Sequence, residues 1–316
     1  MTKPMLIALG GAHVDRRGKV AGRYIPGASN PGAMREEIGG GAFNALRNAV
    51  QRGVAGSLVS LRGGDSAGES VALAVEAAAI KDLSATFLDR ATPSYTAFID
   101  SGGDVIAGLA DTALYELFPK QVMRRHIRDA IQSADAILAD ANLPAAALVR
   151  VASLAMGKPF FAIAISPAKV IRFAAALPAL SLLFMNRREA TTLCEAPADA
   201  PSPTLVQKLR ERGLNSGVIT AGDAAIIAFQ SDSLFSLQPP RLHRTSDATG
   251  AGDALAGATI AAIMRGLPLR AALREGAAAA TATVTEQTAV ARLEERRFRE
   301  ILAGIPECEI ADLSLR

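Results

Sequence analysis

Residues 247–253 combine small side chains with two carboxylates directly before a predicted helix. They read D-A-T-G-A-G-D and precede the helical apolar pattern of residues 255–264. Small residues let a ligand approach the backbone closely, and the first N–H groups of a helix have no intrahelical partners. Gly250, Ala251 and Gly252 are therefore predicted to form a cradle for a phosphate or another oxyanion.

Asp253, in the first turn of that predicted helix, has two interpretations. An acidic residue at this position ordinarily interacts favourably with the helix dipole. A carboxylate beside an anion cradle is also what a phosphoryl transferase needs, because it can take the proton of an attacking alcohol. Physical chemistry alone slightly favours the first interpretation.

A second group of residues lies near the N-terminus. Gly39-Gly40-Gly41 opens a predicted helix over residues 42–52, in which Asn44 and Asn48 are four residues apart and share a face. The Asn44 amide could form two hydrogen bonds with a diol. The alternative is a flexible turn followed by solvated amides.

Asp15 follows closely on the apolar run of residues 5–9, a predicted strand. Ligands of open α/β sheets bind at the carboxyl ends of strands, so Asp15 is a candidate to hold sugar hydroxyls. The neighbouring His13 carries little information alone, since a histidine is more often packed or solvated than catalytic.

Two further short motifs come after predicted strands. Asn186 and Glu189 are three residues apart at the start of a predicted helix, where they could organise Mg²⁺-bound waters and phosphates or simply form a capping pair. Thr220 and Gly222 lie at the turn of a predicted hairpin over residues 218–229. The sequence contains neither a P-loop nor a G-x-G-x-x-G dinucleotide motif, so a bound nucleotide would need another device.

The elements that would position these residues alternate along the chain. Runs that are apolar throughout predict buried parallel strands, and longer segments have helical spacing. We therefore expect a three-layer α/β/α sandwich with a mostly parallel central sheet. The predicted strands are residues 5–9, 136–139, 160–165, 182–185 and 218–220.

Two segments depart from this alternation, residues 13–38 and 92–110. The first is polar and rich in glycine and proline, and the second alternates like a hairpin that turns at residues 101–104. They would suit a small antiparallel sheet over one edge of the main sheet, acting as a lid or a dimer contact. The alternative is a pair of surface loops.

Length and composition limit the class of protein. The chain has 316 residues, half of them apolar, with a formal net charge of +3. This allows one large α/β domain or two smaller ones and excludes a disordered or collagen-like chain. The basic residues are spread along the chain, so a nucleic-acid partner is not indicated.

Location is predicted from three features. The two cysteines, Cys194 and Cys308, are far apart in the sequence, which is typical of a reducing compartment without structural zinc. Residues 1–9 do not have the pattern of a secretory signal. The apolar stretch 173–185 is interrupted by Pro178 and is too short for a membrane span. We expect a cytoplasmic protein without a membrane partner.

Together these motifs resemble the PfkB, or ribokinase-like, family of carbohydrate kinases. The glycine run with Asn44 is similar to the N-terminal signature of the family. Residues 247–253 are similar to its C-terminal signature D-T-x-G-A-G-D, with Ala248 where threonine is usual. Residues 186–189 fit its N-x-x-E element, and Thr220 with Gly222 fits its T-x-G element. The four motifs occur in the family's order over nearly the whole chain.

The resemblance implies a single kinase domain over residues 1–316, an ATP-dependent reaction and a role for each motif. Asp253 would be the base, and Gly250, Ala251 and Gly252 the anion hole. A magnesium ion would be held through water by Glu189, and a potassium site near Asp247 and Thr249 is common in relatives. The implied nucleotide-binding residues are Asn186, Glu189, Thr220, Gly222, Asp247 and Thr249. The implied substrate-binding residues are His13, Asp15, Asn30, Gly39, Gly40, Gly41 and Asn44.

Within the family the chain most resembles pseudouridine kinases. The resemblance lies in residues 29–32 (S-N-P-G), the hairpin with residues 110–111, residues 140–142 (D-A-N) and residues 166–169 (S-P-A-K). It implies phosphorylation of the primary hydroxyl of pseudouridine. Two positions depart from the pattern: His13 replaces a usual asparagine and Ile163 a usual aspartate. The first lies in the implied sugar pocket, so a different nucleoside or a sugar without a base stays open.

Other functions also stay open at this point. A kinase of the same fold could act on ribose, a ketose phosphate, uridine or adenosine. A non-catalytic descendant could bind a nucleoside or sugar as a sensor, although the complete 250–253 segment argues against it. The implied lid also suggests a homodimer, for which the half-apolar alternation of residues 92–110 is the only support in the sequence.

Overall fold

A ten-stranded sheet forms the centre of the protein in the computed structural model, which describes residues 2–100, 102, 105–240, 249–286, 289–292 and 294–311. The strands from β13 to β6 run parallel to their neighbours, and β14, β15 and β16 add an antiparallel edge. This confirms the mostly parallel sheet. In spatial order the strands are β16 (Glu309–Ala311), β15 (Ser233–Leu237), β14 (Ile226–Gln230), β13 (Ser216–Thr220), β12 (Leu182–Asn186), β11 (Phe160–Ile163), β10 (Ala136–Asp140), β1 (Met5–Leu9), β4 (Ala55–Val59) and β6 (Lys81–Asp82).

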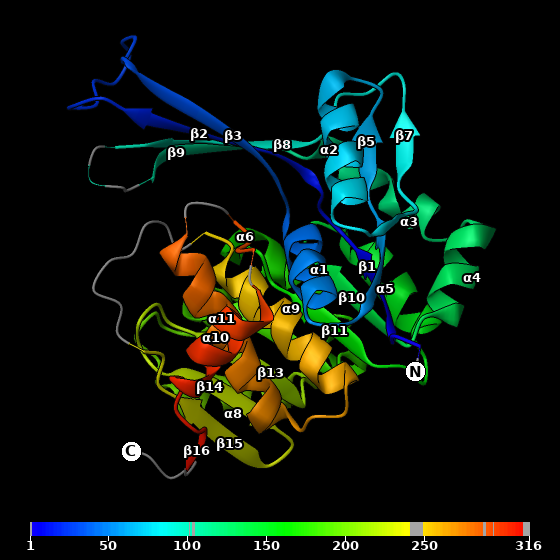
Figure 1. Ribbon diagram of the computed structural model, residues 1–316, viewed down its shortest axis with the longest axis vertical. Helices are drawn as coiled ribbons and strands as arrows, with labels where there is room; N and C mark the ends of the chain where they lie inside the picture. The colour runs from blue at the N-terminus through cyan, green and yellow to red at the C-terminus, as the bar shows by residue number, and fades with distance from the viewer. Residues whose placement is uncertain are drawn as a thin grey trace.

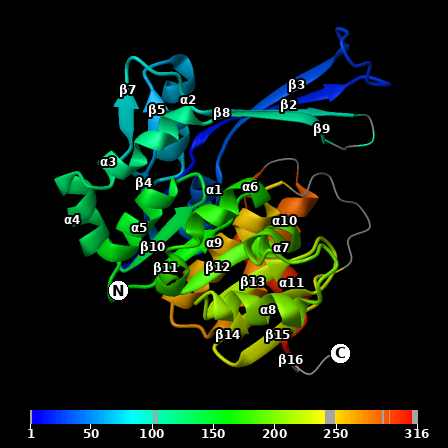
Figure 2. The same ribbon diagram turned by 180° about the vertical axis from the view of Figure 1, so that it is seen from behind.

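Helices cover both faces of this sheet, as Figures 1 and 2 show from opposite sides. Two separate apolar clusters lie between the sheet and its two helical layers. The expected three-layer sandwich is therefore confirmed. One layer holds α1 (Gly41–Gln51), α2 (Ser66–Ala77), α9 (Ala251–Met264), α10 (Leu269–Thr285) and α11 (Glu295–Ala303). The other holds α3 (Phe118–Gln121), α4 (Arg125–Ser133), α5 (Ala145–Leu154), α6 (Pro167–Val170), α7 (Arg187–Leu193) and α8 (Ser202–Glu211), with three short 3₁₀ turns at Ala113–Leu117, Ile171–Phe173 and Leu177–Ala179.

A second sheet extends away from the main body (Figure 1). Its order is β3 (Gly32–Gly39), β2 (His13–Val20), β8 (Ser94–Ile99) and β9 (Val105–Asp111). The segments predicted as a lid therefore pair with each other rather than forming two separate loops, and the predicted hairpin is β8–β9. The sheet is mixed rather than antiparallel as expected, because the two segments meet through the parallel pair β2–β8. Three residues of its predicted turn, 101, 103 and 104, lie outside the described residues. We refer to these four strands as the small sheet.

The remaining strands form a minor pair, β5 (Leu61–Gly63) with β7 (Ala85–Phe87), next to α2. In the described part of the chain, no helix is both long enough and apolar enough to cross a membrane.

Candidate active site

Most of the predicted site residues that the structure describes lie where parallel strands of the main sheet end. Strands β1, β10, β12 and β13 run in the same direction, so their carboxyl ends lie at one edge of the sheet. Helices α1 and α9 lie in the same helical layer on one face of the sheet and pack against each other. Their backbones come very close, since a Cβ added at Gly257 would lie 2.1 Å from the Ala45 carbonyl oxygen. This packing sets the relative positions of the two helix N-termini.

The N-terminus of α9 has a backbone conformation that requires glycine. Gly250 is its N-cap residue, with a φ of 79° in the left-handed region. A Cβ there would also lie 2.1 Å from the Ala289 carbonyl oxygen. The helix begins at Ala251, earlier than the predicted residue 255, so Ala251, Gly252 and Asp253 lie in its first turn, where N–H groups have no intrahelical partners. Asp247 and Ala248, from the same motif, lie outside the described residues.

Asp253 is half-buried at this helix entrance and bonds to α1. Its Oδ2 accepts a hydrogen bond of 2.9 Å from Asn44 Nδ2. The pKa of Asp253 is raised to about 7, mainly by burial and also by the carboxylates of Asp140 and Asp15, while the Asn44 hydrogen bond and the Arg47 charge lower it. A carboxyl group with this pKa can exchange a proton near neutral pH, which suits a general base.

The side-chain amide of Asn44 bonds to two protein side chains, although the sequence predicted that it would bind a ligand. Its Oδ1 accepts a short hydrogen bond from Arg47 Nη2, while its Nδ2 donates to Asp253. Only one N–H of the amide is therefore left for a ligand, whereas the sequence suggested a two-pronged contact with a diol. Asn48 is buried and donates to the Asn44 carbonyl oxygen, so it is not a solvated amide.

The buried His13 and the half-buried Asp15 form a pair at the start of β2. The distance from His13 Nε2 to Asp15 Oδ1 is 3.3 Å, and the opposite ring atom, His13 Nδ1, lies 3.1 Å from the Tyr115 hydroxyl. Tyr115 also bonds to the Ala12 backbone, and burial raises its pKa well above the ordinary value. Tyr115 lies about a hundred residues away in the chain, and no sequence motif indicated it. It fixes the His13 ring against Asp15.

The three glycines before α1 provide space for the side chains around them. A Cβ at Gly39 would lie 2.1 Å from Asp15 Oδ2, and one at Gly41 would lie 2.1 Å from Ile165 Cδ1. Gly40 has a φ of 111°, which disfavours any other residue. The glycine run therefore lets the Asp15 carboxylate come within reach of α1.

A fully buried carboxylate, Asp140, joins β1, α1 and β10. Its Oδ2 accepts hydrogen bonds from the backbone N–H groups of Gly11 and Ala42, both 2.9 Å, and from Asn142 Nδ2. Its Oδ1 accepts from the Asn142 N–H. This residue was not among the predicted site residues, although an aspartate that ends an otherwise apolar strand was the available signal.

Asn186 and Glu189 form a complete capping box at the start of α7. Asn186 Oδ1 accepts from the Glu189 N–H at 2.9 Å, and Glu189 Oε2 accepts from the Asn186 N–H at 2.7 Å. The capping interpretation of the pair is thus realised. Burial raises the pKa of Glu189. Asn186 pairs in register with Thr220 on β13, so these two predicted nucleotide residues lie side by side.

The remaining predicted residues lie outside this cluster or at its margin. Asn30 lies beyond the Val20↔Gly32 end of the β2–β3 ladder, where it bonds to the backbone of Ile25 and Ala28. Val20 comes five residues after Asp15 along the strand, a distance of roughly 17 Å. Within this chain Asn30 is therefore not brought to Asp15. Gly222 is exposed in the β13–β14 turn, and Thr249 immediately precedes Gly250.

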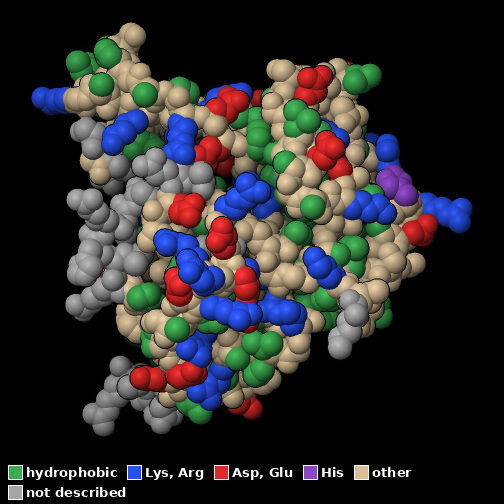
Figure 3. Space-filling view, viewed as in Figure 1, with side chains coloured by type: hydrophobic (Ala, Val, Ile, Leu, Met, Phe, Trp, Pro, Cys, Tyr) green, Lys and Arg blue, Asp and Glu red, His purple; other side chains and the backbone are tan. Residues whose placement is uncertain are grey.

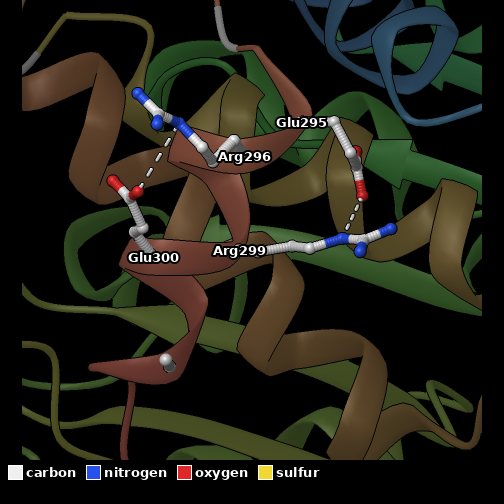
Figure 4. Close-up of a pocket in the computed structure, with 5 residues that line it drawn as sticks. Glu295, Arg296, Arg299 and Glu300 are labelled. Carbon is white, nitrogen blue, oxygen red and sulfur yellow. Dashed lines mark hydrogen bonds and ion pairs between the residues drawn. The ribbon is translucent and has the colours of Figure 1, made fainter.

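The protein also has surface hollows away from this cluster. One of about 580 Å³ lies over α11 and is lined by Glu295, Arg296, Arg299, Glu300 and Ala303 (Figure 4). Its arginines already pair with its carboxylates along the helix. On the face seen in Figure 3, basic and acidic side chains are interspersed in this region. This hollow contains none of the predicted site residues.

Comparison with known proteins supports the resemblance drawn from the motifs. Residues 3–296 match the sequence profile of the pfkB family carbohydrate kinases. The chain is 24% identical to the pseudouridine kinase of Escherichia coli over 281 residues, which cover 86% of this chain and 88% of that protein.

Solved structures agree. A carbohydrate kinase from Agrobacterium tumefaciens is 42% identical, with a TM-score of 0.85 over 98% of this chain and all of that one. An Arabidopsis thaliana ribokinase, solved with ribose and ATP, shares the fold with a TM-score of 0.83 at 18% identity, over 96% of this chain and 99% of its own. The chain therefore belongs to the pfkB family of carbohydrate kinases, with the ribokinase-like fold, and it is a phosphotransferase that acts on a sugar hydroxyl.

Proposed function

We propose that this protein transfers the γ-phosphoryl group of ATP to the primary hydroxyl of a ribosyl compound, with pseudouridine as the first candidate. The observation that carries the proposal is the Asp253 carboxylate at the N-terminus of α9, with a pKa of about 7 and a hydrogen bond from Asn44. This arrangement combines a base with the oxyanion-binding end of a helix.

In the proposed reaction Asp253 accepts the proton of the attacking hydroxyl. The sugar oxygen forms a bond to the γ-phosphorus while the bond from that phosphorus to the β,γ-bridging oxygen breaks, and ADP leaves. The N–H groups of Gly250, Ala251 and Gly252 receive the charge that gathers on the transferred group. The residues of this chain therefore provide a proton acceptor and an anion hole on the same helix turn.

The proposed nucleotide site lies along the ends of β12 and β13. Asn186 and Thr220 are register neighbours there, and Gly222 follows in the turn. Asp247 and Thr249 complete the motif set, and a potassium site beside them stays a prediction.

A divalent metal fits the donors available. Among the described residues no cluster of three or more metal-binding side chains occurs, so a magnesium ion would be held mainly by nucleotide phosphates and water, with Glu189 as the nearby carboxylate. One oxygen of Glu189 already caps α7. When bound, Mg²⁺ would neutralise charge on the phosphates.

The proposed sugar site is formed by Asp15, His13, Asn44 and the glycines 39–41. Asp15 and Asn44 each have hydrogen-bonding capacity for hydroxyl groups, and they converge near Gly39. For Asn30, which lies at the far end of the small sheet, contact with a substrate in the same chain would require the sheet to bend toward the site.

Substrate choice is the finer part of the proposal. The similarity to a pseudouridine kinase supports pseudouridine, but another sugar kinase activity fits the family equally well. A phosphorylation panel of pseudouridine, uridine, adenosine, ribose and fructose derivatives decides between them. We expect the highest kcat/KM for pseudouridine, and a clear preference for a sugar without a base would replace that assignment.

Replacing Asp15 with alanine is expected to weaken sugar binding far more than ATP binding. Hydrogen bonds to a charged group are worth about 1.5–3 kcal/mol, so the Kd of the sugar should rise roughly ten- to hundredfold. Calorimetry with each ligand measures this, with Asp89→Ala on an exposed loop as the control. Equal losses for sugar and ATP would contradict the assignment of Asp15 to the sugar site.

We also propose a homodimer formed through the outer face of the small sheet. Met34, Phe98 and Leu109 lie on one face by register and are 57%, 44% and 71% exposed. Exposed apolar side chains gathered on one sheet face are typical of an interface. Light scattering of the wild type should give a mass of twice the 32.7 kDa of one chain. The Phe98→Glu variant should give the mass of one chain. A wild-type monomer would rule out this interface.

We further propose that residues 1–316 form a single kinase domain, with residues 13–38 and 92–110 as its lid. The cytoplasmic location predicted from the cysteine content stays a prediction.

A further inference from the structure

Arg47, which no motif singled out, is held in the middle of the proposed site. It lies on α1 three residues after Asn44, on the same helix face. Its Nη2 donates to Asn44 Oδ1 and, at 3.2 Å, to the carbonyl oxygen of Ile38 at the end of β3. Its guanidinium carbon lies 4.5 Å from the centroid of the Phe43 ring. The side chain thus connects β3 to α1.

These contacts determine which way the Asn44 amide points. A guanidinium has only donors, so it must face the oxygen of the amide. The Asn44 nitrogen then faces Asp253 and donates to it over 2.9 Å. In the flipped orientation an amide oxygen would face a carboxylate oxygen, which is favourable only when Asp253 carries a proton.

The positive charge of Arg47 also favours the ionised form of Asp253. Asp253 is faced by Asn44 and Arg47 from α1, by Asp140 from β10 and by Asp15 from β2. The pKa of Arg47 is lowered to about 10, because the effect of burial exceeds the opposing effects of Asp253, Glu37 and Asp15, so Arg47 remains a cation at neutral pH. It is the cation that offsets the two neighbouring carboxylates in their effect on Asp253.

We propose that Arg47 is a positioning residue of the active site: by holding the Asn44 amide with its nitrogen toward Asp253, it favours the ionised carboxylate that can accept the substrate proton. The proposal rests on the proposed role of Asp253 as the base. Arg47 itself acts through Asn44 rather than on the substrate.

The test is the pH dependence of kcat/KM for the sugar in wild type, Arg47→Met and Arg47→Lys, measured from about pH 5 to 9. A base must be ionised to act, so the kcat/KM of the wild type should decrease as the pH falls below about 7. We call this decrease the acid limb of the pH profile. Removing the Arg47 charge and its hydrogen bond to Asn44 should move that limb upward by about one unit. Arg47→Lys keeps the charge but not the planar fork, so we expect a smaller upward shift.

Arg52→Met is the matched control. Arg52 immediately follows α1, its guanidinium carbon lies 3.9 Å from the Phe298 ring centroid, and it pairs with Glu295 outside the site. The Arg52→Met variant therefore also loses an arginine that stacks on an aromatic ring. Its acid limb should lie at the same pH as that of the wild type.

The outcomes separate the possibilities. Lower activity in Arg47→Met at every pH with an unmoved limb would mean a purely structural role and would overturn the proposal. If Arg47→Met does not fold, as judged by lost ATP binding in calorimetry, Arg47→Lys decides: a raised limb supports the proposal and a wild-type limb overturns it. Activity retained in Asp253→Asn would contradict the base itself, whereas an inactive Asp253→Asn with an unmoved Arg47 limb contradicts the positioning role alone.

Discussion

Asp253→Asn is expected to lower kcat by about 10²- to 10⁴-fold, the usual contribution of a general base. Asparagine keeps the size of the side chain but cannot accept the hydroxyl proton at neutral pH. The residue lies beside the anion hole rather than along β12 and β13, so ATP binding should change little. Steady-state kinetics and calorimetry with ATP measure the two effects separately.

The control for this substitution is Asp129→Asn on α4, an exposed carboxylate with only a weak helical ion pair. Its kcat should match the wild type. Near-normal turnover in Asp253→Asn would exclude a base at this position, and a matching loss of ATP affinity would mean that the substitution disturbs the nucleotide site.

Asp140→Ala is expected to cost the largest amount of stability. The carboxylate is fully buried and accepts four N–H groups, among them the backbone amides of Gly11 and Ala42. Each buried donor that loses its partner costs roughly 1–3 kcal/mol. We therefore expect the free energy of unfolding to fall by about 4 kcal/mol or more in urea titrations, together with a loss of activity, because the same contacts join β1 to α1.

The control is Asp129→Ala, at the same exposed residue as before. A substitution of an exposed residue should change the free energy of unfolding by less than about 0.5 kcal/mol. Asp140→Asn keeps one acceptor and should fall between the two. A loss below about 1 kcal/mol in Asp140→Ala would show that the surrounding N–H groups find other partners, and the buried carboxylate would then not be what joins β1 to α1.

The main sheet could be predicted from the sequence because its inner strands are apolar on both faces. Residues 5–9 and 136–139 coincide with β1 and most of β10, and the antiparallel turn after β13 occurs where Thr220 and Gly222 indicated it. Strand β4 was missed. Its sequence, A-G-S-L-V, starts with small residues because a Cβ at Gly56 would lie 2.8 Å from Val50 Cγ2 of the overlying helix. Close helix packing thus removed the apolar signal.

The site was predictable where short motifs coincide with strand or helix ends. Asp15, Asn44 and Asp253 were identified that way, and the structure brings the latter two into direct contact. Tyr115 and Arg47 were not identified. Tyr115 reaches His13 only through the tertiary fold, and Arg47 is indistinguishable in sequence from the many solvated arginines of helices. Their positions depend on packing, which local patterns do not encode.

The most direct test of the central claim is one distance in a ternary complex of this protein with pseudouridine, or the substrate that the panel selects, and a non-hydrolysable ATP analogue. We predict that an Asp253 carboxylate oxygen lies within hydrogen-bonding reach of the primary hydroxyl oxygen, about 2.6–3.2 Å, with the γ-phosphate at the N-terminus of α9. A carboxylate turned away from that hydroxyl, or separated from it by another side chain, would contradict the role of Asp253 as the base.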